Sequence, residues 1–160
     1  GVLVAGDRKF YVNKQSLASQ SSYFNNLFFG GFKEKNESEI EIKDVDPKDL
    51  EKILRSMYYC NGQPLYPTDV ETTLQLAQKF DLKILEDKVE NFLLRSDDIS
   101  IHQKLLLSEK YKLEILKEEM ILKYGDKANL ITLSESEEYS QISSEMIRFI
   151  FLKFCDLLKS

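Results

Sequence analysis

The chain has 160 residues and a net charge of −5; 42% of its residues are hydrophobic and 31% are charged. Such a composition suits a globular protein that forms its core without disulfides or metal. The lysines are scattered and no apolar run approaches the ~18 residues of a membrane span, so we expect binding to neither nucleic acid nor membrane. Cys60 and Cys155 have no paired spacing and are interpreted as small buried hydrophobes in a reducing compartment, in the cytoplasm or nucleus.

The N-terminal residues predict a β-hairpin followed by two short helices. β-rich runs flank a turn at Gly6, and a helix is expected to start at Asn13. A second helix, capped by Ser21 or Ser22, is expected to end at Gly30 in a left-handed conformation. Its apolar face carries Phe24, Leu27 and Phe28.

A strand and three helices are predicted next. Ile40 and Ile42 alternate with charged residues, which is the pattern of a half-buried strand over 39–43. Asp46 and Pro47 form a strong helix start, and a capping box at 68–71 predicts another. Apolar residues recur at helical spacing through these segments: Leu50, Ile53, Leu54, Met57 and Tyr58; Val70, Leu74, Ala77 and Phe80; and Leu85, Val89, Phe92 and Leu93.

After a polar break at 95–99 the remaining pattern is helical. Ser100 and Gln103 suggest a capping box, and Ser143 or Ser144 starts the last helix. That helix is apolar nearly all round, so we expect it to pair with something absent from this chain. The predicted layout is an α+β unit, residues 1–95, followed by an all-α extension, residues 96–160.

Catalytic chemistry finds little support in the sequence. The single histidine, His102, is interpreted as a polar surface residue, and too few His and Cys residues exist for a metal site. The cysteines lie in apolar settings that raise a thiol pKa, and Gly30-Gly31 lacks the Lys-Ser/Thr of a phosphate loop. We therefore predict a binding module, with no enzymatic activity and no cofactor.

One loop residue stands out. Phe32 lies among Gly, Lys, Glu, Asn and Ser, just beyond a predicted helix end. A phenylalanine there either folds under its own domain or serves as an anchor for another protein, and the pattern leaves both open.

The motifs over residues 2–95 resemble the BTB/POZ domain family, in which a hairpin precedes a "His-Lys-x-x-Leu-Ala-x-x-Ser-x-Tyr-Phe" helix pair. The matching residues are Lys14, Leu17, Ala18, Ser19, Ser22, Tyr23 and Phe24, then Val45, Pro47 and Tyr58. Asn13 stands where the family usually has His. The matching residues do not include the N-terminal helix that completes the homodimer in many relatives. Residues 100–158 are similar to the BACK domain or its shorter "3-box" form.

This resemblance implies a BTB/POZ fold and the role of a substrate adaptor for a cullin-3 ubiquitin ligase. Relatives that bind cullin-3 carry a hydrophobic-x-Glu motif after the third helix, and Phe32, Lys33 and Glu34 match it. The partners implied are the N-terminal region of cullin-3, a second copy in a homodimer, and a target protein held by a domain not in this chain, such as a MATH or Kelch domain. Two other interpretations stay open: a self-associating scaffold or corepressor platform without a cullin, and an oligomer like a channel tetramerisation domain.

Overall fold

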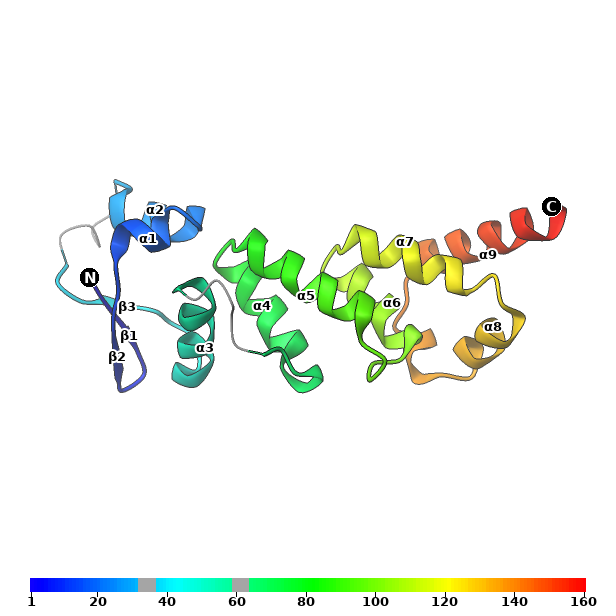
Figure 1. The fold of residues 1–160 in the computed structure, drawn as a ribbon, viewed down its shortest axis with the longest axis horizontal. Coiled ribbons are helices and arrows are strands. Elements are labelled where there is room, and N and C mark those ends of the chain that lie inside the picture. Colours follow the sequence, from blue (N-terminus) through cyan, green and yellow to red (C-terminus); the bar gives the residue numbers. More distant parts are fainter. Residues whose placement is uncertain (32–36, 59–63) are drawn as a thin grey trace. The chain divides into compact units, whose positions relative to one another are not determined.

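The computed structural model describes residues 1–31, 37–58 and 64–160 (Figure 1). The chain divides into two compact units, Gly1–Val89 and Glu90–Ser160. The first combines a small sheet with helices and the second is helical, so the predicted α+β fold with a helical extension is confirmed.

The sheet of the first unit has three strands in the order β2-β1-β3. Strands β1 (Val2–Ala5) and β2 (Arg8–Tyr11) form the predicted antiparallel hairpin, in which Leu3 lies opposite Phe10. Gly6 has a φ of +57° in the turn between them, a conformation that favours glycine. Strand β3 (Ile40–Glu41) pairs parallel to β1 and is shorter than the 39–43 expected from alternation, although Ile40 and Ile42 are both buried as predicted.

Two short helices follow the hairpin, and both begin with a side-chain cap. The Asn13 carboxamide caps α1 (Lys14–Ala18) by accepting from the Ser16 N–H, and Ser21 caps α2 (Ser22–Phe29) by accepting from the Phe24 N–H. The Ser21 hydroxyl also donates to the Phe80 carbonyl, so one buried serine joins the start of α2 to a segment 59 residues away. Ser21 therefore both caps α2 and holds this helix against the segment that contains Phe80.

Three further helices complete the first unit: α3 (Pro47–Tyr58), α4 (Val70–Lys79), preceded by a 3₁₀ turn at Pro67–Asp69, and α5 (Lys83–Arg95), which continues into the second unit. The Asp46 carboxylate accepts from the Lys48 N–H at 2.8 Å and confirms the predicted start of α3. Helix α4 begins one residue later than the capping box predicted. Thr68 lies within the 3₁₀ turn, and the N-cap residue of α4 is Asp69, which makes no side-chain cap.

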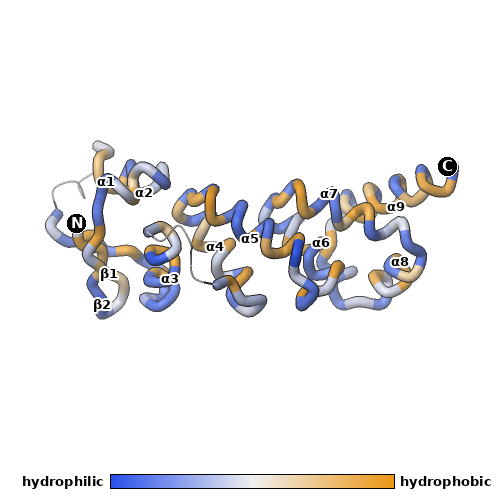
Figure 2. Tube along the Cα trace, viewed as in Figure 1, coloured by the Kyte–Doolittle hydropathy of each residue, from blue (hydrophilic) through white to orange (hydrophobic). Residues whose placement is uncertain are grey.

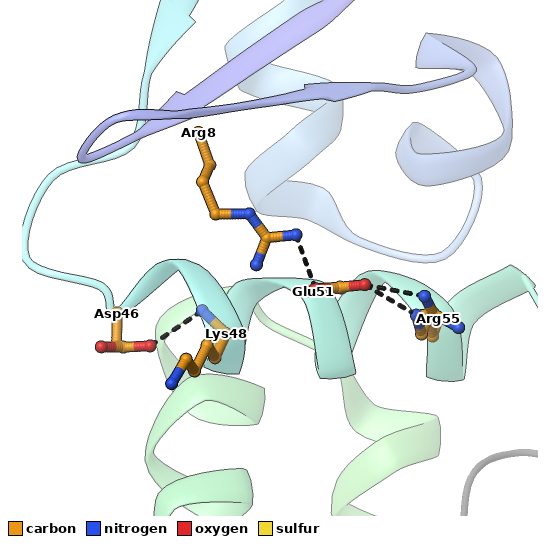
Figure 3. Close-up of polar contacts among 5 residues, drawn as sticks. All are labelled: Arg8, Asp46, Lys48, Glu51 and Arg55. Atoms are coloured by element: carbon orange, nitrogen blue, oxygen red, sulfur yellow. Dashed lines mark hydrogen bonds and ion pairs between the residues drawn. The ribbon is translucent and has the colours of Figure 1, made fainter.

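A salt-bridge network connects the hairpin to α3. Glu51 accepts from Arg8 and from Arg55, each at 2.7 Å, with Arg8 reaching from the strand above the helix (Figure 3). The hydrogen bonds from Arg55 and then Arg8 hold the pKa of the Glu51 carboxyl below its usual value. Because all three side chains are substantially exposed, this network contributes little to stability.

An aromatic cluster forms the centre of the first core. The Phe24 ring stacks on Phe28 and on Phe80, with the Phe24 and Phe80 ring centroids 5.3 Å apart, and Tyr23 meets Phe80 edge-on. Phe24 and Phe80 are fully buried. The apolar stripes predicted for α2, α3 and α4 thus converge on one core, with Leu3, Leu17, Leu50, Ala77 and Leu85 among its other members.

The second unit contains the end of α5 and the helices α6 (Ile101–Lys110), α7 (Glu114–Lys123), α8 (Lys127–Ser134) and α9 (Ser144–Lys159), with a 3₁₀ turn at Glu137–Ser140. Ser100 caps α6 and Ser143 caps α9, both as predicted. Helix α8 was not anticipated; it is capped by Asp126 and buries only Leu133. The core of this unit includes Leu93, Leu105, Leu116, Met120, Tyr124, Leu133, Met146 and Ile150.

Candidate functional site

The predicted binding motif lies outside the part of the chain that the structure describes. Phe32, Lys33 and Glu34 all fall between the described ranges 1–31 and 37–58, so the motif stays a prediction from sequence. What is described is the segment that leads to it, the end of α2 and Gly30-Gly31.

The end of α2 corrects one expectation. Gly30 is in an extended conformation, with φ −67° and ψ 174°, and not in the left-handed conformation predicted for it. Its N–H donates to the Asn26 carbonyl at 2.9 Å, and a Cβ at this position would lie only 2.3 Å from the same oxygen. Glycine is therefore needed for a close approach to the helix end and not for a positive φ.

An apolar hollow of about 330 Å³ opens on the surface of the first unit. It lies where the end of α3 meets the start of α5, and we name it the α3–α5 groove, lined by Gln20, Met57, Leu82, Ile84, Leu85 and Lys88 among others. Leu82 and Leu85 are buried, whereas Ile84 is 73% exposed. An isoleucine this exposed beside a concave apolar surface is typical of a protein-binding site.

A smaller hollow of about 110 Å³ adjoins this groove and shares Ser56, Leu85 and Lys88 with it. It adds Tyr66, which is 57% exposed, and Lys52, whose ammonium lies 3.1 Å from the Asp69 carboxylate. Together the two hollows present apolar side chains interspersed with lysines. Such a surface suits an apolar segment of another protein.

Sequence reasoning did not identify the groove. Ile84 directly precedes the buried Leu85, so it falls off the stripe that the helix buries. A large aliphatic residue at an off-stripe position is the signal that could have found it.

His102 differs from the sequence interpretation as a plain surface residue. Its ring is partly buried and stacks on Tyr124; Nδ1 lies 2.7 Å from the Tyr124 hydroxyl, and Nε2 lies 3.0 Å from the Thr132 hydroxyl. The Thr132 hydroxyl donates to the Asn129 carbonyl, so it accepts from His102 Nε2–H, and Tyr124 donates to Nδ1. Burial lowers the pKa of His102 and raises that of Tyr124.

The arrangement of these groups is structural. His102 joins α6 to α8 through Thr132 and to the end of α7 through Tyr124. The described parts of the chain place no cysteine or carboxylate in hydrogen-bonding contact with His102. Within residues 1–31, 37–58 and 64–160 no cluster of three His, Cys, Asp or Glu side chains could hold a metal ion. The helices described there include none long and apolar enough to cross a membrane. Cys60 lies outside the described residues, and Cys155 is a half-buried free thiol and not a fully buried one.

Comparison with known proteins places these features in context. The BTB/POZ domain family model matches residues 2–97. The chain is 40% identical over 117 residues to BTB and MATH domain-containing protein 15 of Caenorhabditis elegans, covering 72% of this chain and 42% of that protein. It is 27% identical over 158 residues to BTB and MATH domain-containing protein 36 of the same organism, covering 99% and 49%.

A human relative matches a shorter segment. Kelch-like protein 38 is 36% identical over 67 residues, which is 42% of this chain and 11% of that protein. The chain thus spans less than half the length of the curated relatives named here.

Proposed function

Because the chain belongs to the BTB/POZ family, we propose that it is a substrate adaptor that binds the N-terminal region of cullin-3 through the Phe32-Lys33-Glu34 loop. The coarser statement, a protein-interaction module, is supported by the family and by the BTB-MATH and Kelch-like relatives. Catalysis has no part in this proposal, and the adaptor would act in the cytoplasm or nucleus.

The α3–α5 groove is the observation that carries the proposal. It supplies a concave apolar surface with Ile84 exposed on it, in the unit that also contains the end of α2. The smaller hollow beside it adds the exposed Tyr66. Protein interfaces concentrate their binding energy in a few apolar or aromatic anchors near such hollows. We infer that the groove receives an apolar helix of the cullin while Phe32 provides a second anchor.

The loop motif contributes two kinds of contact. Phe32 follows Gly30-Gly31 in sequence, and Gly30 closes tightly on the end of α2. In the proposed complex Phe32 fills a pocket on the partner, and the Glu34 carboxylate accepts a hydrogen bond at the rim. Truncating a hot-spot phenylalanine costs about 2 kcal/mol of binding free energy, roughly a thirtyfold rise in Kd.

Titration calorimetry with the purified N-terminal domain of cullin-3 tests the proposal. Phe32→Ala is expected to abolish measurable binding or to raise the Kd at least thirtyfold, and Glu34→Ala is expected to raise the Kd by a smaller factor. Ile84→Arg is expected to raise the Kd because it places a charge in the groove. Lys33→Ala, at the variable position of the same motif, is the matched control and leaves the Kd unchanged.

Thermal melts of the same variants complete the test. Phe32→Ala is expected to leave the Tm nearly unchanged. If it instead unfolds the domain, Phe32 belongs to the core and the motif loses its role; if it binds cullin-3 as the wild type does, the adaptor proposal is wrong.

We further propose that residues 1–95 are the BTB/POZ domain and that residues 96–160 are a BACK- or 3-box-like extension that widens the cullin contact. The target protein would be held by another domain, by analogy with relatives that are named for a MATH domain. A self-associating scaffold without a cullin is the second candidate, favoured by the exposed apolar surface of α9.

A further inference from the structure

Helix α7 exposes two large aliphatic side chains. Ile115 is 60% exposed and Leu122 is 51% exposed, whereas the helix buries Leu116 and Met120. Residues of high and low hydropathy are interspersed along this helix (Figure 2). Single exposed apolar residues are ordinary on a protein surface, so the relative directions of these two decide whether they form a binding surface.

The two exposed aliphatic side chains share one side of α7. At about 100° per residue, Ile115 and Leu122 differ by only about 20° in direction and lie about 10 Å apart along the helix axis. Their mean direction is roughly 130° round the helix from that of the buried Leu116 and Met120. Ile115 and Leu122 therefore form a ridge on the side of α7 that faces away from its core.

Two carboxylates separate the aliphatic side chains on this ridge. Glu118 and Glu119 lie about 50° to either side of it, whereas Lys117 and Lys123 lie about 90° or more away. Both glutamates are exposed, and neither carboxylate makes an ion pair or a hydrogen bond with any residue that the structure describes. The four residues on this side of the helix are called the α7 face: Ile115, Glu118, Glu119 and Leu122.

The charges of the α7 face discriminate among possible occupants. A second copy of the chain that used the same face, in either direction, would bring Glu118 and Glu119 of both copies together at its centre, which is repulsive. An anionic lipid surface is repelled for the same reason. A helix that has cations between two apolar residues is complementary, because its apolar residues cover Ile115 and Leu122 while its cations meet the carboxylates.

We propose that the α7 face is a docking surface for a helix of another protein, one that carries two apolar residues seven positions apart with lysine or arginine at both central positions between them. That spacing matches Ile115 and Leu122 when the two helices pack nearly parallel or antiparallel. Burial of Ile115 and Leu122 provides affinity, and Glu118 and Glu119 select the partner by charge. The docking uses neither the Phe32-Lys33-Glu34 loop nor the α3–α5 groove, so this partner binds independently of the proposed cullin contact.

An NMR titration of the 160-residue chain with a synthetic peptide tests the proposal. The probe is an alanine-rich helical peptide of about 18 residues with two leucines seven positions apart and lysines at the two central positions between them. We expect saturable binding, with amide shifts confined to α7 and its neighbours, that weakens as salt is added. The variant with both Ile115→Ser and Leu122→Ser is expected to lose this binding.

Charge reversal tests the selection of the partner. The variant with both Glu118→Lys and Glu119→Lys is expected to raise the Kd of the lysine peptide about tenfold and to bind the same peptide with glutamates in place of lysines. Ile131→Ser, which changes an isoleucine on α8 that is 47% exposed, is the matched control and leaves the Kd unchanged. Circular dichroism of each variant confirms that the helices remain folded.

Calorimetry with the cullin-3 N-terminal domain separates this proposal from the adaptor role. The variant with Ile115→Ser and Leu122→Ser is expected to bind the cullin with the wild-type Kd, and Phe32→Ala is expected to bind the peptide with the wild-type Kd. An α7 variant that loses the cullin would instead assign the α7 face to the cullin contact and overturn the proposal.

Three further outcomes would overturn it. The first is a lysine peptide that shifts no α7 amide at any concentration. The second is a glutamate peptide that binds the wild-type chain as well as the lysine peptide does. The third is a set of α7 amides that shift with the concentration of the chain alone, which means that a second copy occupies the α7 face.

Discussion

Replacing Glu90 tests how α7 is held in the second unit. Glu90 is only 7% exposed, and its carboxylate accepts at 3.2 Å from the N–H of the fully buried Leu116, in the first turn of α7. The N-cap residue of that helix, Leu113, makes no side-chain cap. Glu90 thus supplies from α5 the acceptor that the local sequence lacks.

The magnitude follows from burial. In Glu90→Ala the Leu116 N–H loses its acceptor at a site with little access for water, and an unsatisfied buried donor costs about 1–3 kcal/mol. We expect about 2 kcal/mol of lost stability and a roughly thirtyfold faster exchange of the Leu116 amide. Glu90→Gln keeps an acceptor oxygen and nearly the same volume, so it is expected to lose less than about 1 kcal/mol.

Hydrogen exchange followed by NMR measures the local effect, and urea unfolding followed by circular dichroism measures the global one. Glu118→Ala, on the exposed side of α7, is the control and should change neither quantity. The reasoning is refuted if Glu90→Ala leaves Leu116 exchange unchanged, or if Glu90→Gln is as destabilising as Glu90→Ala.

Two further predictions concern the cores. Burial lowers the folded-state pKa of His102, even though Glu138 opposes the shift. The unfolded chain therefore binds more protons than the folded chain just below pH 6.5, and the free energy of unfolding is expected to decrease as the pH falls through this range. The slope should vanish in His102→Gln, which removes the only histidine, and a folded-state NMR titration giving a pKa above 6.5 would contradict the prediction. Phe24→Ala is expected to cost about 3–5 kcal/mol, since the fully buried ring packs on Phe80, whereas Phe29→Ala, half exposed, should cost under about 1 kcal/mol. Equal losses of Tm in these two variants would show that the aromatic cluster is not the centre of the core.

Local signals were reliable where a single short-range interaction decides the outcome. Asn13, Asp46, Ser100 and Ser143 cap helices as predicted, because a capping side chain bonds to an N–H two or three residues along the same chain. The apolar stripes identified most of the core for the same reason, since helical spacing alone places those residues on one face.

The two failures have different causes. Gly30 was expected to have a positive φ, but the close approach of Asn26 makes glycine necessary in an extended conformation. His102 was expected at the surface, but Tyr124 and Thr132, 22 and 30 residues away, turn its ring inward. The Gly30 contact is local, four residues back along α2, and glycine at a helix end fits either conformation. The surroundings of His102 come from residues distant in the sequence and are not visible from its neighbours.

One part of the candidate site can be predicted from the sequence, and the other part depends on the fold. The hydrophobic-x-Glu spacing of Phe32 and Glu34 involves only consecutive residues, so it can be recognised from amino-acid order alone and remains a sequence-based prediction. The α3–α5 groove required the fold, because segments around Gln20, Met57 and Ile84 are distant in sequence and form a concave surface only when the helices pack. Amino-acid order specified which helices form and which faces they bury. Packing determined which of the remaining apolar residues stay exposed, because the exposure of a side chain depends on the neighbouring elements that cover it and not on the helix that carries it.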